Sequence, residues 1–388
     1  MSSHLQKINK QIKTAIVTLV GNYNYGNVLQ MYALQTTLQR LGHEVTIINR
    51  QANFPPLNLF FLRILSVIKC AYRIYIRRDK DCVICSPLSG YYQTKVDYKN
   101  IKIFKDKYLK MSKSIRSCKE LERHARRNRY DCYVVGSDQV WRENYTPNIT
   151  DYFLKFLPHN NTALKITYAA SFGKEKEFIS PAHLSECIEL AKRFDRISVR
   201  EEGGVKIMSE VFNLPAKHVL DPTLLLQASD YRILIADNLR EQPEKGLVTY
   251  ILDTTPEKQE SIRNLANKLQ IPYTPIPYSL EELQPTLKVY SVYDWLYSID
   301  NAQYVITDSF HGTVFCILFH KPFICIGNEG RGSSRFTSLL KIFHLEDRLV
   351  SSLEDFTDTP INWEEVDAIL ATKRAEAMEF LTTALNQG

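Results

Sequence analysis

Short apolar segments that end in glycine or polar residues recur along this chain, and they constrain its fold more than any other feature. The first, residues 14–20 (TAIVTLV), precedes a turn rich in glycine and asparagine at residues 21–27. Apolar residues then recur with helical spacing as far as Gly42, where a helix would end, and residues 44–50 (EVTIINR) form the next apolar segment. A strand–helix–strand beginning of this kind predicts a parallel sheet covered by helices.

The same pattern continues through the chain. Further strands are predicted at residues 130–135, 165–170, 196–200, 218–220, 246–252, 303–307 and 322–327. Helices are predicted at residues 256–269 and 312–320, whereas residues 271–277 (IPYTPIP) hold too many prolines for the interior of a central strand. Because ligands bind beyond the carboxyl ends of parallel strands, the chemistry is expected in the loops that follow these strands.

The length of 388 residues favours two domains, since single cores tend to split beyond roughly 250–300 residues. A second strand–helix series begins near Gly246, so we predict an α/β fold with domains at residues 1–215 and 216–388. The second domain would end in a helix at residues 362–386, where Asn362 and Glu365 have the spacing of a capping box.

The distribution of charge predicts an anionic partner near the first part of the chain. Residues 1–130 hold 24 Lys and Arg against 7 Asp and Glu, whereas the remaining residues hold 25 against 36. No apolar run reaches the ~18 residues of a membrane span, and the eight cysteines are irregularly placed. We therefore expect a soluble cytoplasmic protein.

Two loops of the first domain carry candidate binding residues. The turn at residues 21–27, which contains Asn27, lies between a strand and a helix start, but it lacks both the P-loop motif and the GxGxxG motif of dinucleotide folds. The segment VVGSDQVW follows another strand and offers side chains for an acceptor: Ser137, Asp138, Gln139 and Trp141. The alternatives are purely structural: glycines that serve a tight turn, and a carboxylate that caps a helix.

The segment TDSFHGTVF carries the candidate catalytic residue. If Ser309 or Asp308 caps the helix, His311 lies near the helix N-terminus, where an imidazole suits acid–base chemistry near neutral pH. A structural histidine bonded to a carbonyl is the alternative. Asn328 begins a polar stretch that also supplies Arg331 and Arg335, whose guanidinium groups can hold phosphate or carboxylate.

The basic insertion at about residues 55–130 has two parts. Residues 57–78 mix apolar and aromatic residues with five basic ones, which is typical either of an amphipathic helix on an anionic membrane or of a core helix with a basic outer face. Residues 102–129 hold eleven basic side chains but no recognised nucleic-acid module, so no nucleic-acid partner is predicted. Cys82 and Cys85 form an isolated CxxC, to which no metal is assigned.

A series of motifs resembles the polysaccharide pyruvyl transferase family. The motifs appear in the family's order over roughly residues 14–345: GNYNYGNVLQMYALQTTLQRLGHEV, VVGSDQVW, YAASFG, ISVREE, LDPTLLL and TDSFHGTVF. The resemblance implies two Rossmann-like domains facing a cleft, as in the GT-B glycosyltransferase architecture. It also implies transfer of pyruvate from phosphoenolpyruvate to sugar hydroxyls as a ketal, with no metal or cofactor.

On this resemblance, His311 matches the family's motif histidine and is the predicted general acid and base. The expected ligands of phosphoenolpyruvate are Arg331, Arg335, Arg200, Ser309 and Asn328. Some family members carry a lysine at the position of Arg331, so which cation meets the phosphate stays open. Asn27 and Asp138 are expected to position the acceptor.

The leading hypothesis is a ketal pyruvyl transferase that acts on a precursor of a surface polysaccharide. If the acceptor is a lipid-linked oligosaccharide, the basic segment would lie at the inner face of the cell membrane. Two other functions stay open: a sugar-nucleotide glycosyltransferase of the same fold, and a non-catalytic protein that binds glycans or anions.

Overall fold

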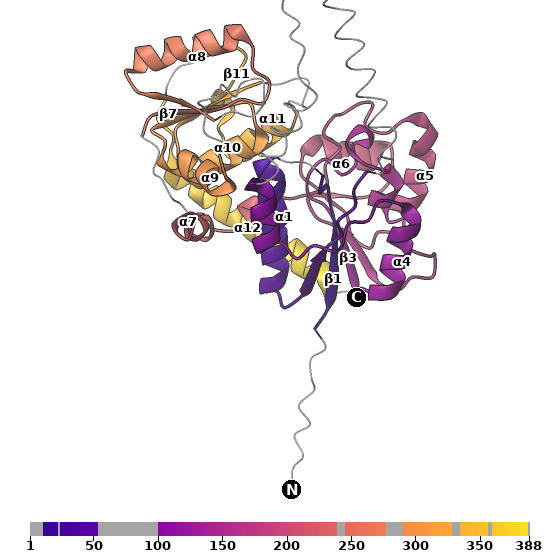
Figure 1. Cartoon of the computed structure of the whole chain (residues 1–388). Helices are drawn as coiled ribbons and strands as arrows, with labels where there is room; N and C mark the ends of the chain where they lie inside the picture. Colours follow the sequence, from indigo (N-terminus) through magenta and orange to yellow (C-terminus); the bar gives the residue numbers. More distant parts are fainter. Residues whose placement is uncertain are drawn as a thin grey trace, which may run out of the picture.

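Two parallel sheets, one in each half of the chain, form the framework of the protein (Figure 1). The structure is a computed structural model, and it describes residues 11–21, 24–52, 100–238, 245–276, 290–327, 334–355 and 359–386. Helices flank both sheets, so the predicted α/β fold with two Rossmann-like units is confirmed.

The first sheet has the strand order β2-β1-β3-β4, and all neighbouring strands are parallel. Its strands are β1 (Lys13–Val17), β2 (Glu44–Ile47), β3 (Cys132–Val135) and β4 (Leu164–Thr167). Two short strands, β5 (Ser198–Val199) and β6 (Lys217–His218), pair with each other. Single bridges from Ile166 and Ala170 join the β5 segment to the first sheet, which places the ends of β3, β5 and β6 near one another.

The second sheet has the order β11-β10-β9-β7-β8, again with parallel pairs. Its strands are β7 (Leu247–Tyr250), β8 (Tyr273–Pro275), β9 (Tyr304–Thr307), β10 (Phe323–Ile326) and β11 (Leu349–Val350). The proline-rich strand β8 lies at the edge of the sheet, as its sequence predicts, because proline cannot donate a ladder hydrogen bond.

The helices are placed between and around these strands. Their bounds are α1 (Tyr25–Arg40), α4 (Cys118–Asn128), α5 (Pro181–Ala191), α6 (Glu202–Glu210), α7 (Ala228–Ala236), α8 (Pro256–Leu269), α9 (Val292–Asn301), α10 (Phe310–Leu318), α11 (Ser334–Ile342) and α12 (Trp363–Leu385). Residues 100–108 are also helical. Short 3₁₀ turns are η1 (Glu143–Tyr145), η2 (Ile149–Phe153), η3 (Pro222–Leu224), η5 (Glu346–Arg348) and η6 (Leu353–Asp355).

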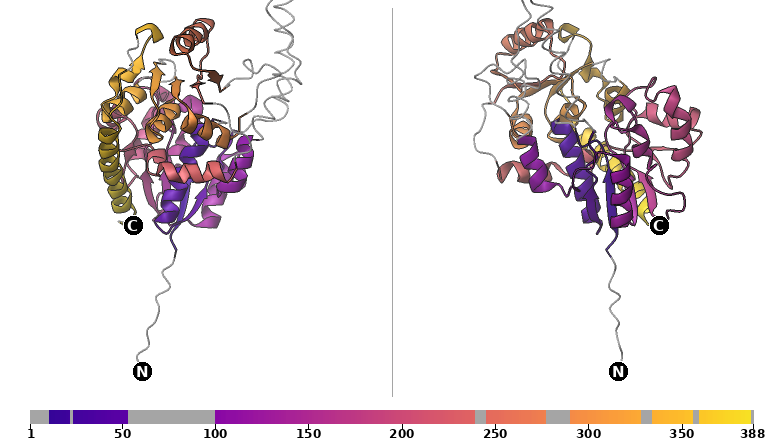
Figure 2. Two further views of the ribbon diagram at one scale, coloured as in Figure 1. Left: turned by 90° about the vertical axis from the view of Figure 1, so that its left-hand side faces the viewer. Right: turned by 45° about the vertical axis from the view of Figure 1, so that its right-hand side comes forward.

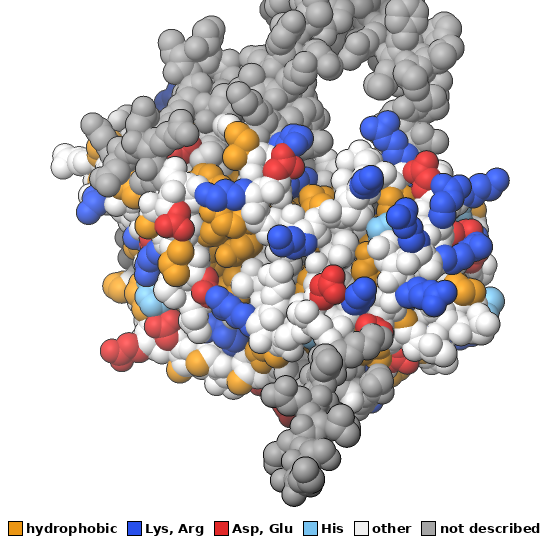
Figure 3. All heavy atoms as spheres, turned by 60° about the horizontal axis from the view of Figure 1, so that its bottom comes forward, with side chains coloured by type: hydrophobic (Ala, Val, Ile, Leu, Met, Phe, Trp, Pro, Cys, Tyr) orange, Lys and Arg blue, Asp and Glu red, His pale blue; other side chains and the backbone are white. Residues whose placement is uncertain are grey.

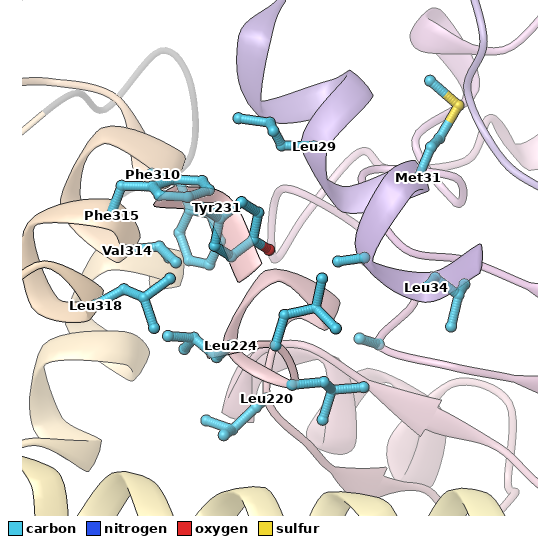
Figure 4. Close-up of a cluster of buried hydrophobic side chains, with 14 of the residues drawn as sticks. Leu29, Met31, Leu34, Leu220, Leu224, Tyr231, Phe310, Val314, Phe315 and Leu318 are labelled. Carbon is cyan, nitrogen blue, oxygen red and sulfur yellow. The ribbon is translucent and has the colours of Figure 1, made fainter. Parts of the chain in front are cut away.

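One hydrophobic core runs between the two sheets. Side chains of β1 alternate, so Ile16 joins this inner core while its neighbours Ala15 and Val17 join a separate core under α4 and α5. The inner core contains residues of α1, α9, α10 and α12 together. Figure 4 shows Leu29 of α1 and Val314 of α10 in this cluster, with Leu224 of η3 beside them. The two halves therefore share buried apolar contacts.

The last helix, α12, runs from the second half back to the first (Figure 2). Arg374 on this helix donates hydrogen bonds to the carbonyl oxygens of Leu224 (2.7 Å) and Leu226 (3.2 Å). At the start of α12, Asn362 accepts a hydrogen bond from the Glu365 backbone N–H at 3.3 Å, so the predicted helix and its cap are confirmed.

Some sequence predictions fall outside these observations. The basic segment 57–78 and the pair Cys82 and Cys85 lie outside the described residues. The domain boundary between residues 215 and 216 stays a prediction. Among the helices of the described ranges, none combines the length and the apolar character needed to cross a bilayer.

Candidate active site

The predicted site residues of the two halves meet where the strands of the first sheet end and helix α10 begins. Asp138 follows β3, Arg200 follows β5, and Asp221 follows β6. His311 approaches them from α10, whose preceding strand, β9, belongs to the second sheet. This is the position at which open parallel sheets bind ligands.

His311 is the second residue of α10, and Ser309 fixes the start of that helix. The Ser309 hydroxyl accepts a hydrogen bond from the Gly312 backbone N–H at 3.3 Å, which confirms its predicted role as the N-cap. The imidazole is 9% exposed, and its Nε2 lies 3.6 Å from Oδ2 of Asp221. That distance suits an ion pair and is slightly too long for a hydrogen bond.

Gly26, near the start of α1, contacts the other side of the imidazole. A Cβ atom added to Gly26 would lie 2.2 Å from both Cγ and Nδ1 of His311. Real Cβ atoms do not approach other atoms so closely, so any side chain at this position must displace the ring. The absence of a side chain on Gly26 is therefore what lets α1 and His311 meet.

Asp221 is held from several directions in the interior. Its Oδ1 accepts from the Thr223 backbone N–H (3.0 Å) and hydroxyl (2.7 Å), and its Oδ2 accepts from Nη1 of Arg200 (2.9 Å) and from Ser137 (3.3 Å). Burial by itself would raise the pKa of Asp221, but the charges of His311 and Arg200 outweigh it and hold this pKa well below its usual range. Asp221 is therefore a carboxylate at neutral pH.

Arg200 is surrounded by acidic side chains. Besides Asp221, its guanidinium lies 3.7 Å from Asp138 and 4.0 Å from Glu201, and it stacks 4.5 Å from the ring centre of Phe310. Burial would lower the pKa of Arg200, but the three carboxylates raise it above its usual value. Since these carboxylates already balance its charge, Arg200 organises the cluster more than it offers a free cation to a donor.

Asp138 and Asn27 form the part of the cluster that belongs to the first sheet. The Asn27 amide donates to Oδ2 of Asp138 at 3.0 Å and to the carbonyl of Leu19 at 2.8 Å. Asp138 has φ = 74°, a left-handed conformation that a non-glycine residue rarely adopts and that clusters at functional sites. Burial would raise the pKa of Asp138, but Arg200, His311 and the Asn27 hydrogen bond lower it overall.

Arg335 reaches the same region from α11. It is 6% exposed, and its guanidinium lies 5.7 Å from the ring centre of Phe310, on which Arg200 also stacks. Burial, followed by the charge of Arg200, lowers the pKa of Arg335 to about 10, so Arg335 remains a cation at neutral pH. The structure thus brings Arg335 to the cluster, and its role as a donor ligand stays a prediction.

Two other predicted residues, Trp141 and Gln139, have other contacts. Trp141 is fully buried, donates to the carbonyl of Tyr152 at 3.2 Å, and stacks on Phe153 with ring centres 5.2 Å apart. Gln139 accepts from Arg142 at 2.9 Å. Both side chains are therefore occupied by contacts within the first half of the chain. Asn328 and Arg331 lie outside the described residues.

The cluster as a whole combines two arginines, one histidine and three carboxylates. Within the described ranges, no three or more His, Cys, Asp or Glu side chains are arranged to hold a metal ion. The arrangement can instead bind an anion at Arg335, exchange a proton at His311, and orient hydroxyl groups through Asp138 and Asn27.

Comparison with known families shows the family to which the chain belongs. A family model described as polysaccharide pyruvyl transferase matches residues 24–330. The chain belongs to the polysaccharide pyruvyl transferase family. The resemblance seen in the sequence motifs is therefore confirmed, and the protein is a member of a family of enzymes.

Solved structures also align with this pyruvyl transferase family member. UDP-N-acetylglucosamine 2-epimerase from Rickettsia bellii is 8% identical, with a TM-score of 0.49 and coverage of 97% of this chain and 98% of that one. UGT89C1 from Arabidopsis thaliana, complexed with quercetin, is 12% identical, with a TM-score of 0.42 and coverage of 97% and 94%. A comparison with curated proteins gave no match.

Three residues of this pyruvyl transferase cluster were missing from the candidates drawn from the sequence. Asp221 stands inside the motif LDPTLLL, Gly26 inside the turn after β1, and Glu201 directly after Arg200. All three follow a strand, which is the one signal that could have selected them. Their proximity to His311 or Arg200 depends on packing between segments far apart in the sequence.

Proposed function

We propose that this protein is a ketal pyruvyl transferase that moves pyruvate from phosphoenolpyruvate to two hydroxyl groups of one sugar in a surface-polysaccharide precursor. Membership of the family supports the transfer of a pyruvyl group in polysaccharide synthesis. The observation that carries the finer proposal is the arrangement around His311, where an imidazole, a buried carboxylate and two buried arginines meet at strand ends.

Phosphoenolpyruvate needs cations for its phosphate and carboxylate. Arg335, a buried cation near Phe310, supplies one of them in this proposal, and the N-terminus of α10 adds its helix dipole. Arg331 and Asn328, predicted from the polar stretch after β10, are proposed to complete the donor site. Arg200, with its charge already balanced, holds Asp221 and Asp138 in place.

The reaction needs one proton delivered to carbon. His311 protonates the methylene carbon C3 of phosphoenolpyruvate while the first sugar hydroxyl attacks C2 and gives up its proton, which restores the acid. The phosphate then leaves with the bridging oxygen, the second hydroxyl attacks C2, and its proton leaves with the phosphate. Both ketal oxygens therefore come from the sugar, and one pyruvate unit replaces two hydroxyl protons.

The acceptor would lie on the side of the first sheet. Asp138 and Asn27 present a carboxylate and an amide next to the His311–Asp221 pair, and Ser137 precedes Asp138 on the loop after β3. These are groups that can align hydroxyls of a sugar. Gln139 and Trp141, which the sequence also suggested, are occupied elsewhere, so the proposal does not use them.

The test is an assay with phosphoenolpyruvate and a panel of glycosides, followed by phosphate release and product mass. We expect a product heavier by pyruvic acid less one water, together with inorganic phosphate. His311→Asn should reduce the rate about 10²- to 10⁴-fold, as loss of a general acid does, while circular dichroism shows that the fold is retained. Release of a nucleotide from a sugar nucleotide, with no reaction of phosphoenolpyruvate, would refute the proposal.

We also propose that the enzyme works in the cytoplasm at the inner face of the membrane, on a lipid-linked acceptor. Seven basic side chains on and beside α4 are exposed, and we call them the α4 basic face: Lys113, Arg116, Lys119, Arg123, Arg126, Arg127 and Arg129. Figure 3 shows Lys and Arg side chains gathered on the right of the molecule, the side on which Figure 1 places α4. Such a face is attracted to anionic lipid.

A further inference from the structure

The two nitrogens of the His311 ring have different surroundings. Nε2 is buried, has no hydrogen-bond partner among the described residues, and faces Oδ2 of Asp221 at 3.6 Å. The remaining exposure of the side chain, 9%, therefore does not belong to Nε2. Nδ1 lies on the opposite edge of the ring, beside the Cα of Gly26.

Asp221 cannot rotate away from the ring without losing other bonds. Both of its oxygens already accept hydrogen bonds, Oδ1 from Thr223 and Oδ2 from Arg200 and Ser137. The Arg200 partner is itself 1% exposed and bound among carboxylates. The position of the Asp221 carboxylate is therefore fixed before any substrate binds.

From these contacts we propose that Asp221 and Gly26 are the positioning residues of His311, and that Nδ1 is the nitrogen that exchanges a proton with the substrate. Asp221 attracts the N–H of the ring to Nε2, so the neutral ring keeps its proton there. Gly26, which has no side chain, leaves room for the ring. The proton exchange between Nδ1 and the substrate rests on the proposed function. The position of the ring and of its proton does not.

Residues from both halves of the chain are needed to orient the proton donor, His311. His311 lies on α10, which follows β9 of the second sheet. Gly26 lies on α1, which follows β1 of the first sheet, and Asp221 follows β6. Asp138, whose carboxylate also acts electrostatically on His311, comes from β3. The imidazole is therefore correctly oriented only when α1 and α10 are packed together.

The first experiment measures the tautomer of His311 in the folded wild-type protein. Nitrogen-15 NMR of protein labelled at histidine separates protonated from unprotonated ring nitrogens, and the His311→Asn spectrum identifies the signals of His311. We expect the proton of the neutral ring on Nε2, with Nδ1 unprotonated. A neutral ring with its proton on Nδ1 would overturn the inference, whether or not the protein transfers pyruvate.

The second experiment uses variants on both sides of the ring. Asp221→Asn removes the charge that faces Nε2, so the share of the Nε2-protonated tautomer should fall; an unchanged share would refute the role of Asp221. Gly26→Ala should move the ring and lower kcat on the order of 100-fold, since small misplacements of a reacting group have costs of that size.

Gly203→Ala is the matched control for Gly26→Ala. Gly203 lies in α6, and a Cβ there would meet only the flexible Glu175 side chain, whose nearest atom, Oε1, would lie at 3.3 Å. We expect wild-type kcat and an unchanged His311 spectrum for this variant. A Gly26→Ala protein with wild-type kcat and an unchanged spectrum would exclude Gly26 as a positioning residue. If wild-type protein transfers no pyruvate but has the expected tautomer, only the proposed function fails.

Discussion

At the scale of single residues, the protein buries several charges that must be compensated. The cluster of Arg200, Asp138, Glu201 and Asp221 does this by mutual pairing, and none of its members stands alone. Removing one partner of such a group is costly because it leaves an uncompensated buried charge. The cluster therefore gives the site rigid geometry.

Lys105 is a different case, because burial of its ammonium group lowers its pKa. Its Nζ donates to the carbonyl of Val20 at 2.7 Å, and burial lowers the pKa of Lys105 to about 8 from 10.5. Between those two values the unfolded chain binds more protons than the folded chain, so stability should rise with pH.

The prediction for Lys105 concerns the difference in the free energy of unfolding between wild type and Lys105→Met. From pH 8 to pH 9.5, the free energy of unfolding of wild type should gain about 1–2 kcal/mol relative to the variant, given about 1.4 kcal/mol for each pKa unit. Urea unfolding of both proteins at several pH values measures this. A constant difference over that range would show that burial does not perturb Lys105.

The sequence predicts some of these residues better than others. His311 could be selected because a serine cap two residues earlier places it at a helix start, which is local information. The partners Gly26 and Asp221 are separated from it by most of the chain, so only packing reveals them. Trp141 was a candidate for sugar stacking, but the apolar surroundings of Phe153 and Phe172 place its ring in the core.

At the scale of elements, the predicted strands are largely confirmed. Continuous apolar runs such as CYVV and FICI made them predictable, because such runs are typical of parallel strands buried on both faces. Proline content correctly predicts that β8 is not central. Helix α4 was not predicted, because it presents only Leu121 and Ala125 to the core and is otherwise polar. Strands β5 and β6 are only two residues long, so their extent depends on pairing.

Helix α10 gives the prediction at this scale. Its cap, Ser309, accepts from Gly312, and the loss of such a cap costs about 1 kcal/mol. Ser309→Ala should lower the free energy of unfolding by that amount, whereas Ser309→Asn, which retains a capping oxygen, should lose much less. Chemical denaturation of the three proteins provides the measurement. Equal stability of all three would mean that the cap does not hold α10, and with it His311, in place.

At the scale of the whole molecule, the two sheets are joined by a common core and by α12. Leu29, Leu224 and Val314 belong to one buried cluster although they come from different parts of the chain (Figure 4). Arg374 adds hydrogen bonds from α12 to the segment after η3. A rigid connection of this kind suits a site to which both halves contribute side chains.

The α4 basic face gives a prediction about the whole molecule on a surface. Vesicles containing anionic phospholipid should bind the protein in flotation assays, and the binding should weaken with salt. Reversing Arg126 and Arg127 to Glu should reduce binding, at about 1 kcal/mol for each cation lost. Reversal of Arg263 and Lys268, which are exposed on α8, is the control. If binding depends neither on salt nor on the pair Arg126 and Arg127, the α4 basic face is excluded as the membrane contact.

The central claim is that pyruvate is transferred from phosphoenolpyruvate with cleavage of its C–O bond. The most direct measurement uses phosphoenolpyruvate labelled with oxygen-18 at the oxygen that bridges carbon and phosphorus, with an accepted glycoside. The label should leave entirely with the inorganic phosphate, because both ketal oxygens come from the sugar. Label retained in the pyruvyl group, with unlabelled phosphate, would contradict it.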